Sequence, residues 1–567
     1  MQPETKICQN CKQDFTIGQE DFNFYEKMKV PPPTWCPECR MIRRLASVNV
    51  WSLYWRDCDK CGDRTMSMHS PKSKIKVFCS KCWWADDWDG TEYGIDYNPS
   101  RPFLEQVKEL SEKTPYAAKE TLYTSLKNSD YSNGLSWCKN CYMIFWADYC
   151  ENVYYSSILN GLKWSSDCIR GFNSELCYGS IGFSKNYMVF FSDECDSCVN
   201  VWFSRNCYGC TDCVGCANLR GATNCIFNQK YSKEEYAKKL KELRFDSWKS
   251  LNDFKNEAYN FWFSAPYREY DGHSLNVNVT GEHVYTSRNS KECYIVNGAE
   301  NCKWCQFLTV SSSKDCRDYS GWGNNAMLMY ECATVGENVN NTMFSYHCTP
   351  DIINLQYCLF NIAGKNNFGC ANLKRKSYCI LNKQYAKEEY EKLKERIIED
   401  MKLNPYVDKQ GRKFPYGEFF PPEMSKFPYN KSTAMKFFPK SKEEALAMGY
   451  AWDDEDNSST ECTIKSAVLP DTIQETNDEI LKEIIECANC ARAYRITQGE
   501  LGLMRKIGLP LSHECPKCRE NKRFAKMTKP GMHHRNCAKC GETIYTPYPP
   551  DDPRIVYCVK DYQALFA

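Results

Sequence analysis

Three short stretches decide the fold of the central region: CENVYYSSI at 150–158, NYMVFFSDE at 186–194 and CVNVWFSRN at 198–206. Each combines aromatic and β-branched residues with Asn, Ser or Asp at its ends. Cysteines recur around them near multiples of nine, in two frames three residues apart: Cys141, Cys150, Cys168, Cys177 and Cys195, then Cys198, Cys207, Cys216 and Cys225. Short strands at a fixed period predict a parallel β-solenoid. Two nine-residue units predict an 18-residue coil whose interior is filled by small apolar thiols.

The solenoid pattern occurs twice. CANLRGATNCIFNQKYSKEEYAKKLKEL at 216–243 matches CANLKRKSYCILNKQYAKEEYEKLKERI at 370–397, at an offset of 154 residues. Each copy ends in a charged segment with helical spacing, which predicts a helix covering the exposed end of each solenoid. In the second copy most cysteines leave the nine-residue register, so we expect insertions in its coils.

The run CYGCTDCVGC brings Cys207, Cys210, Cys213 and Cys216 close together in sequence. Such spacing is also found in iron–sulfur ligation, but the bacterial ferredoxin run has three residues before its fourth Cys and a Pro after it. Neither feature is present, and the solenoid period accounts for all but Cys210. The sequence therefore favours a packing role. The G-G-x-G-x-D signature of calcium-binding β-rolls is also missing, so no calcium is expected.

Both ends of the chain carry pairs of C-x-x-C motifs. The N-terminal sets are Cys8, Cys11, Cys36 and Cys39, then Cys58, Cys61, Cys79 and Cys82; the C-terminal sets are Cys487, Cys490, Cys515 and Cys518, then Cys537, Cys540, Cys558 and Asp561. Every member of the C-terminal sets lies 479 residues after its counterpart. Two C-x-x-C turns supply the four tetrahedral ligands that zinc prefers. The recurrence predicts a duplicated two-site module and three to four zinc ions per chain.

The fourth site is the exception, because Asp561 stands where its counterpart is Cys82. Zinc accepts a carboxylate oxygen, so Asp561 is the expected ligand. A neighbouring histidine, His533 or His534, or the loss of the metal, are the alternatives. Iron is the chemical rival of zinc in the sites with four thiolates.

The stretch CQNCKQDFTIGQEDFNFYEKMKVPPPTWCPECRMIRR at 8–44 resembles a family of small zinc-ribbon, treble-clef-like domains. The shared pattern is C-x-x-C, then Phe15, an acidic-aromatic helix start, Pro31 to Pro33 and C-P-x-C-R. The copy at 487–519 keeps the cysteines and Arg519, with Tyr494 in place of the Phe. The resemblance implies zinc binding without a defined activity. The whole chain is also similar to uncharacterised cysteine-rich proteins of candidate-phyla bacteria.

The composition suits a chain with reduced thiols. Its 37 cysteines are an odd number, which rules out complete internal pairing, and the first 15 residues contain no apolar signal-peptide core. No run of 18 apolar residues predicts a membrane span. We therefore expect a cytoplasmic protein that does not enter a membrane. The formal net charge of +1 gives no global polycation for nonspecific nucleic-acid binding.

These observations predict a mainly β protein with two tandem parallel β-solenoids flanked by zinc-ribbon modules and joined by short helices. The expected parts are an N-terminal double zinc-ribbon module (1–100), a helical connector (101–130), the first solenoid (131–230), a helical cap and linker (231–272), the second solenoid (273–384), a helix and Pro/aromatic-rich arm (385–475) and a C-terminal double zinc-ribbon module (476–567).

Three functions remain open at this stage. No P-loop, dinucleotide fingerprint, H-E-x-x-H or G-x-S-x-G motif is present, so a non-enzymatic, zinc-binding scaffold with a protein partner is favoured. A nucleic-acid or ribosome-associated role rests on basic and aromatic residues of the terminal modules: Arg40, Arg43, Arg44, Arg519, Lys522, Arg523, Lys526, Trp51, Trp55, Trp83, Trp84 and Trp88.

The third function is a β-helix enzyme acting on polysaccharide. It would need paired carboxylates, for which the candidates are Asp193, Glu194, Asp196, Asp315 and Asp318. The scattered histidines are interpreted as surface or hydrogen-bonded structural residues: His69, His273, His283, His347 and His513. The oligomeric state is left open.

Overall fold

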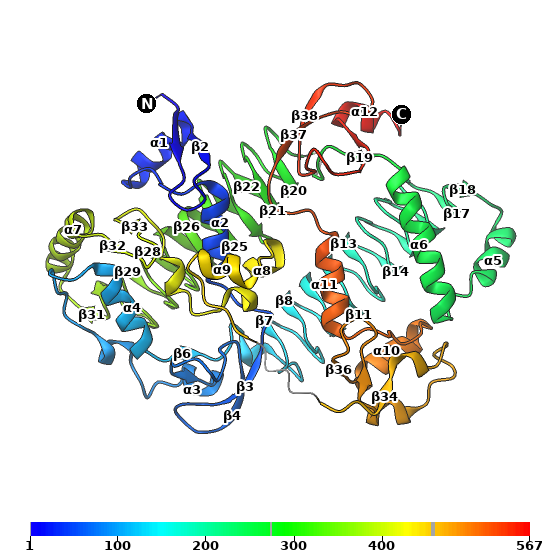
Figure 1. Ribbon diagram of the computed structural model, residues 1–567, viewed down its shortest axis with the longest axis horizontal. Helices are drawn as coiled ribbons and strands as arrows, with labels where there is room; N and C mark the ends of the chain where they lie inside the picture. Colours follow the sequence, from blue (N-terminus) through cyan, green and yellow to red (C-terminus); the bar gives the residue numbers. More distant parts are fainter. Residues whose placement is uncertain (1, 273–274, 455–459, 567) are drawn as a thin grey trace.

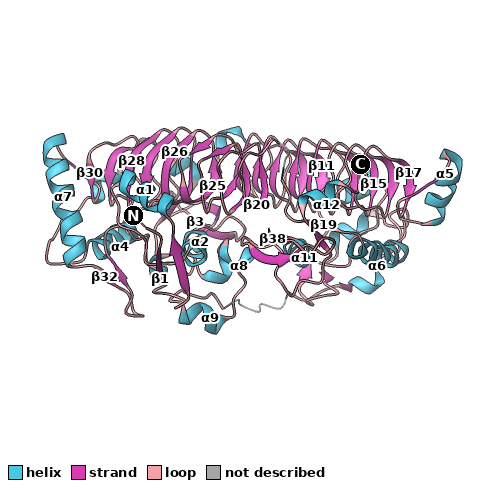
Figure 2. Cartoon of the chain, turned by 90° about the horizontal axis from the view of Figure 1, so that it is seen from above, coloured by secondary structure: helices cyan, strands magenta, loops and turns pink. Residues whose placement is uncertain are grey.

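The computed structural model describes residues 2–272, 275–454 and 460–566, so His273 lies outside the described residues. Strands form 30% of the chain and helices 25%, with extensive parallel sheet. Figure 1 shows two repeat regions that start near the middle of the molecule and run to opposite ends. Seen from above in Figure 2, their turns form one long row, and most helices and the terminal modules lie along one side of it.

The first repeat region pairs its strands in parallel at a constant register. Ser157 pairs with Ile169, and Val199 pairs with Thr211, in each case 12 residues later. The predicted 18-residue repeat is therefore wrong: the strand pairing repeats every 12 residues. The strands are β7 (Asn133–Ser136), β8 (Phe145–Asp148), β9 (Glu151–Tyr154), β10 (Ser157–Asn160), β11 (Lys163–Ser166), β12 (Ile169–Phe172), β13 (Ile181–Ser184), β14 (Tyr187–Phe190), β15 (Val199–Trp202), β16 (Thr211–Val214), β17 (Thr223–Ile226) and the antiparallel β18 (Gln229–Lys230).

The underlying period is three residues. Left-handed backbone recurs at every third position, as at Trp146, Tyr149 and Asn152, with φ of 50°, 55° and 56°. Interior side chains also stand three residues apart, and Val201 takes the next interior position after Cys198. Four three-residue units make one 12-residue repeat. The nine-residue spacing spans three such units and the shift between frames spans one, which is why both appeared in the sequence.

The same period explains the cysteine run. Cys207, Cys210, Cys213 and Cys216 are all buried in the interior of the first repeat region. Their sulfurs lie against backbone carbonyls, as Cys216 does against Cys225 O at 3.6 Å. They are not among the described residues whose ligand atoms converge as a metal would require. The packing role expected for this run therefore extends to Cys210, which the nine-residue period had left unexplained.

The second repeat region has a less regular register. Pairs lie 12 residues apart at its start (Glu282 with Tyr294), 14 in the middle (Gln306 with Ser320) and 13 further on (Val339 with Ile352). The expected insertions are therefore present. Its strands are β20 (Gly281–Tyr285), β21 (Cys293–Asn297), β22 (Ala299–Glu300), β23 (Gln306–Leu308), β24 (Ser313–Lys314), β25 (Arg317–Gly323), β26 (Ala326–Gly336), β27 (Val339–Met343), β28 (Ile352–Gln356), β29 (Lys365–Phe368), β30 (Cys379–Ile380) and β31 (Lys383–Gln384).

Asparagine ladders join successive turns. Asn341 Nδ2 donates to Asn354 Oδ1, and Asn354 Nδ2 donates to Asn366 Oδ1, each at 2.8 Å. All three residues have left-handed backbone, with φ between 49° and 58°. Asn tolerates this conformation better than most residues, and its amide can bond the same group in the next turn. The ladders therefore fix the stacking of the turns at their corners.

A helix follows the last turn of each repeat region, as predicted. These are α5 (Lys233–Glu242) and α7 (Lys387–Leu403), at the two ends of the row in Figure 2. Tyr236 and Tyr390, equivalent at the offset of 154, are buried contacts of these helices. The helices cover strand edges that would otherwise be open to pairing with other chains.

The terminal modules are built from short elements. The N-terminal module contains β1 (Glu4–Ile7), β2 (Asp14–Ile17), α1 (Gln19–Met28), α2 (Pro37–Ala46), β3 (Tyr54–Asp57), β4 (Arg64–Ser67), β5 (Val77–Phe78) and α3 (Ser80–Trp84). The C-terminal module contains β34 (Ile464–Lys465), β35 (Ile485–Glu486), β36 (Ala493–Tyr494), α10 (Gln498–Ile507), α11 (Pro516–Lys526), β37 (His533–Asn536), β38 (Thr543–Thr546), β39 (Val556–Tyr557) and α12 (Val559–Gln563).

The connecting segments contain α4 (Phe103–Lys113), β6 (Tyr116–Ala117), α6 (Trp248–Ser264), β19 (Tyr267–Arg268), β32 (Tyr406–Val407), β33 (Lys413–Phe414), α8 (Ala434–Phe437) and α9 (Lys442–Ala447). Short 3-10 turns lie at Gly90–Tyr93, Tyr123–Ser125, Pro422–Met424, Tyr429–Lys431, Ser466–Val468 and Asp478–Lys482. In the described ranges, no helix has both the length and the apolar character needed to cross a membrane.

Candidate metal centres

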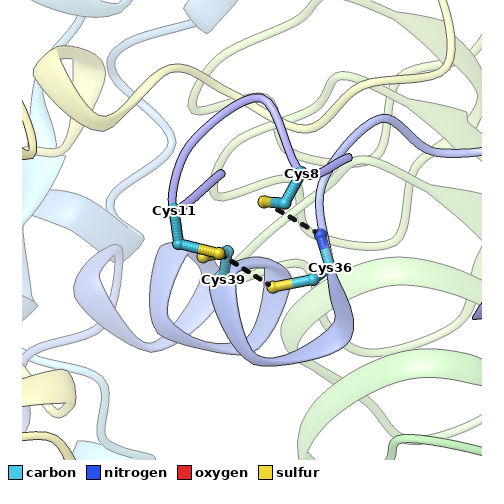
Figure 3. A group of neighbouring side chains, drawn as sticks. All are labelled: Cys8, Cys11, Cys36 and Cys39. Carbon is cyan, nitrogen blue, oxygen red and sulfur yellow. Dashed lines mark hydrogen bonds between the residues drawn. The ribbon is translucent and has the colours of Figure 1, made fainter. Parts of the chain in front are cut away.

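The structure brings each of the four predicted ligand sets together. Within every set, one potential ligand atom from each residue lies within 4.8 Å of the others. Figure 3 shows the first set, in which the four cysteine side chains point toward a common centre. The coarse expectation of four groups able to hold a metal ion is thus confirmed, and their cysteines are free thiols rather than disulfides.

The same local structure builds all four groups. The first two ligands lie in the turn of a two-stranded hairpin, β1–β2, β3–β4, β35–β36 or β37–β38. The third ligand is the residue immediately before a helix, and the fourth lies in its first turn: α2, α3, α11 or α12. A helix N-terminus favours negative charge, so this placement stabilises thiolates.

Sulfur–sulfur distances match a tetrahedral ion. The second and third ligands of the four sets are separated by 3.7 Å (Cys11–Cys36), 3.9 Å (Cys61–Cys79), 3.8 Å (Cys490–Cys515) and 3.9 Å (Cys540–Cys558). Two thiolates on one tetrahedral zinc, each with a Zn–S bond of about 2.3 Å, lie about 3.8 Å apart. The spacing fits a shared ion and is far longer than the roughly 2 Å of a disulfide bond.

A backbone amide points at the first sulfur of every set. The N–H of the third ligand donates to the sulfur of the first at 3.2 Å in all four cases: Cys36 to Cys8, Cys79 to Cys58, Cys515 to Cys487 and Cys558 to Cys537. Burial opposes ionisation at Cys58 and Cys487, but nearby backbone amides lower the pKa of both thiols to about 7. These sulfurs are therefore prepared to bind metal as thiolates.

Two further residues contact the sets that begin with Cys8 and Cys487, and neither was identified from the sequence. Asn10 Nδ2 donates to Cys39 Sγ at 3.2 Å, and Asn489 Nδ2 donates to Cys518 Sγ at 3.3 Å. The two asparagines obey the 479-residue offset, so the duplication carried the signal that could have identified them. They hold the fourth sulfur in place, as outer hydrogen bonds do for metal ligands generally.

The fourth set includes Asp561, as predicted. Its Oδ2 lies 3.3 Å from Cys537 Sγ and 3.4 Å from Cys558 Sγ. A thiolate and a carboxylate oxygen on one tetrahedral zinc lie about 3.6 Å apart, so the spacing fits. His533 and His534, the alternative ligands, stand exposed on β37 and do not belong to the converging group.

The arginines of the N-terminal module are buried rather than displayed. Arg40, Arg43 and Arg44 lie on α2 and are at most 1% exposed. Arg44 Nη1 pairs with Asp318 at 3.1 Å and Arg40 Nη2 with the same carboxylate at 2.8 Å. Arg43 Nη2 lies 3.1 Å from both Glu331 and Glu418. The contacts with Asp318 and Glu331 join the N-terminal module to strands β25 and β26 of the second repeat region.

The C-terminal module repeats the contact against the other repeat region. Arg523 Nη1 lies 2.6 Å from Asp167, and Arg519 Nε lies 3.2 Å from the same carboxylate. Arg519 Nη2 also lies 2.9 Å from Glu500 on α10. Asp167 belongs to the first repeat region and, like Asp318, has left-handed backbone. Arg519 and Arg523 are the counterparts of Arg40 and Arg44 at the offset of 479. Each module therefore docks by the same two helix positions.

This packing buries most of the residues on which the nucleic-acid hypothesis rested, although Lys522 stays exposed. Besides the arginines, Trp51, Trp83 and Trp88 are buried. Of the five candidate tryptophans, only Trp55 is exposed. Lys526 is held by Asp193 and Tyr259. The buried side chains form the cores and docking contacts of the modules.

The carboxylates considered for polysaccharide hydrolysis separate into two groups. Asp318 is buried under Arg40 and Arg44, and Asp315 pairs with Lys27, so both have structural roles. Asp193, Glu194 and Asp196 line a cavity of about 750 Å³. Of the histidines, His69 and His347 are buried in aromatic surroundings, His513 stacks on Trp248, and His283 also lines the cavity.

No protein-family model matches the chain, and a search of curated proteins finds none with significant sequence similarity.

Proposed function

We propose that the protein is a zinc-dependent scaffold in which four zinc ions fold and dock the two terminal modules. The main support is that four complete ligand sets converge, with the sulfur–sulfur distances expected around a tetrahedral ion. Each set supplies four protein ligands, which leaves no position for a substrate and is typical of structural zinc. The hairpin-plus-helix arrangement supports a zinc-ribbon or treble-clef class for each site.

We further infer that each repeat region is a β-solenoid with coils of about 12 residues. Parallel pairing at that interval, inward cysteines and asparagine ladders support this inference. The resulting scaffold is elongated, and its ends are covered by α5 and α7. Such a solenoid supplies a long side surface on which another protein can bind.

Exposed aromatic side chains on the first repeat region favour a protein partner. Trp137 and Tyr149 are 57% and 58% exposed, stand 12 residues apart and stack with an interplanar angle of 4°. Aromatic residues are enriched at protein interfaces, because they bury a large area at little entropic cost. The free state of all the cysteines is consistent with a reducing compartment such as the cytoplasm.

Elemental analysis of the purified chain tests the proposal directly. We expect four zinc ions in the terminal modules of each chain, with no iron in the thiolate sites. One zinc or none would overturn the assignment of the terminal modules, and iron in their place would change the metal but keep the sites. Pull-down after nuclease treatment separates a protein partner from nucleic acid, since material held through nucleic acid would be lost.

The hydrolase alternative keeps one supporting observation, the carboxylates in the cavity. Glu194 and Asp271 bring carboxylate oxygens within 4.8 Å of each other there. A retaining glycosidase places its two carboxyl groups about 5 Å apart. Release of reducing sugar ends from a polysaccharide, lost in Glu194→Gln, would support this alternative over the non-enzymatic scaffold.

A further inference from the structure

The cavity lies where the first repeat region, α6, the start of the second repeat region and the C-terminal module meet. Its volume is about 750 Å³, which is enough for a small molecule. Its walls include Arg170 and Glu194 from the first repeat region, Trp262 from α6, His283 from β20 and Tyr548 from the C-terminal module. Unlike the four cysteine-rich sites, it therefore combines polar groups with open space.

His283 is the centre of a polar cluster in this cavity. Its Nδ1 lies 3.0 Å from Asp271 Oδ2, and the Tyr285 hydroxyl donates to the same oxygen at 2.8 Å. Because the carboxylate can only accept, the proton of a neutral His283 sits on Nδ1 and Nε2 carries the lone pair.

The lone pair of His283 faces two more carboxylates. Nε2 lies 3.5 Å from Glu282 Oε1 and 3.9 Å from Glu194 Oε1. The imidazole is only 6% exposed, and no donor from the described residues forms a hydrogen bond with Nε2. Three acceptors directed at one another are mutually repulsive unless a proton or a cation lies between them.

The carboxylates of the cluster repel one another. Three of them, Glu194, Asp271 and Glu282, surround His283, while Arg170 pairs with Glu194 and supplies one positive charge. A cation bound among them would relieve this repulsion. The Arg170–Glu194 pair is itself accommodated by Gly182, where φ is +65° and a Cβ would collide with both side chains.

We propose that this cluster binds one divalent transition-metal ion through Glu194, Asp271 and His283, whose ligand atoms lie within 4.8 Å of one another, with Glu282 beside the imidazole. Nitrogen and oxygen ligands on one metal lie about 3–3.5 Å apart. His283 Nδ1 lies 3.0 Å from Asp271 Oδ2, so the ion would take the place of the proton between them. Imidazole with carboxylates suits Mn²⁺, Fe²⁺ or Zn²⁺, in contrast to the sulfur sites.

Three protein ligands leave coordination positions open toward the cavity. An ion there can hold a water molecule or an oxygen of a small substrate, as an open site does. The site is thus of the kind used for ligand binding or chemistry, whereas the four thiolate-rich sites are closed. The proposal does not depend on the thiolate sites, because it rests on different residues and a different set of ligand atoms.

Mn²⁺ is the probe of choice, since thiolate sites already filled with zinc exclude it. The zinc-loaded chain is titrated with Mn²⁺, and free ion is counted from its electron paramagnetic resonance signal. We expect one bound Mn²⁺ per chain, or, where zinc already fills the cavity, a fifth zinc in elemental analysis. Glu194→Gln and His283→Gln, which nearly keep side-chain volume, should each remove this one ion and leave four zinc.

Asp196→Asn is the matched control, because it removes a carboxylate from the same cavity wall but not from the cluster. It should retain the fifth ion. No bound Mn²⁺ together with only four zinc in the parent chain would overturn the proposal. Equal Mn²⁺ binding by the parent and both cluster variants would mean an adventitious ion only. Loss of zinc from the thiolate sites with the cavity ion retained would instead refute the scaffold proposal alone.

Discussion

The N-terminal and C-terminal modules arrange their candidate ligands in the same way but dock on different parts of the chain. Both place the first two ligands in a hairpin and the last two at a helix start, with an amide-to-sulfur distance of 3.2 Å. The N-terminal module packs on the second repeat region through Arg44 and Asp318, and the C-terminal module packs on the first through Arg523 and Asp167. What the two copies share is therefore the arrangement of the candidate ligands together with one buried arginine–aspartate contact.

The two modules differ in how many buried ion pairs they form. Arg43 is buried between Glu331 and Glu418, whereas its counterpart Lys522 is 55% exposed at its side chain and pairs with Glu514. The N-terminal contact thus buries three arginines against three acids, and the C-terminal contact buries two against two. An added buried cation comes with an added acid, since an unpaired buried charge costs several kcal/mol.

Removal of one thiolate ligand should have the largest effect. Cys8→Ser is expected to release the first zinc and unfold the segment around α1 and α2, because binding of structural zinc contributes about 10 kcal/mol or more to such small modules. Elemental analysis should find one zinc fewer than in the parent chain, and hydrogen exchange should accelerate in residues 4–46 but not in the first repeat region. Cys462→Ser, which removes a cysteine outside every set, is the control and should keep the parent zinc content.

Cys537→Ser extends this experiment to the C-terminal copy. It should release the fourth zinc while the N-terminal module stays protected from exchange. A loss of protection at both ends from either substitution would mean that the modules do not fold independently, and the comparison between them would fail.

The docking arginines should have the next largest effect. Arg44→Ala and Arg523→Ala each leave a buried aspartate with one arginine partner instead of two. Breaking a buried ion pair costs up to about 3–5 kcal/mol. The loss should appear as faster hydrogen exchange in α2 and α11, with zinc content unchanged. Lys522→Ala removes an exposed ion pair and should cost under about 1 kcal/mol. Equal effects of Arg44→Ala and Lys522→Ala would show that the buried contact does not hold the module.

The sequence predicted which residues would converge better than it predicted the repeat. The sets recur at one offset, and zinc chemistry restricts which residues can fill them, so Asp561 was also assigned to its group. The coil length was predicted wrongly, because cysteine occupies only some interior positions. Spacings of nine, such as Cys168 to Cys177, are multiples of the true three-residue period, and the sequence alone did not reveal the smaller unit.

Contacts between segments far apart in the chain could not be predicted from the sequence. Arg44 and Asp318 are 274 positions apart, and nothing local distinguishes a docking arginine from a solvated one. The cavity cluster is assembled from the first repeat region and from the start of the second, so His283 and Asp271 gave no recognisable motif. The spacing of cysteines in the sequence predicts which of them can share a metal ion. Contacts between segments far apart in the sequence depend on the completed fold.

Exchange of the one differing ligand should have a smaller effect, of opposite sign in the two copies. Asp561→Cys should strengthen zinc retention at the fourth site, and Cys82→Asp should weaken it at the second, each by about tenfold, since zinc binds a thiolate more firmly than a single carboxylate in such sites. Competition with a chelator, followed by zinc count, measures both. Retention that is unchanged by either exchange would mean that this position is not a ligand.

The smallest effect is expected from His533→Ala combined with His534→Ala. Both side chains are exposed on β37, while Asp561 Oδ2 already lies 3.3 Å and 3.4 Å from two sulfurs of the fourth set. The double variant should therefore keep the zinc content and the chelator resistance of the parent chain. Loss of one zinc would mean that a histidine replaces Asp561 on the metal. The hairpin would then have to bend toward the helix, and the C-terminal copy would differ from the N-terminal one in backbone as well as in ligand.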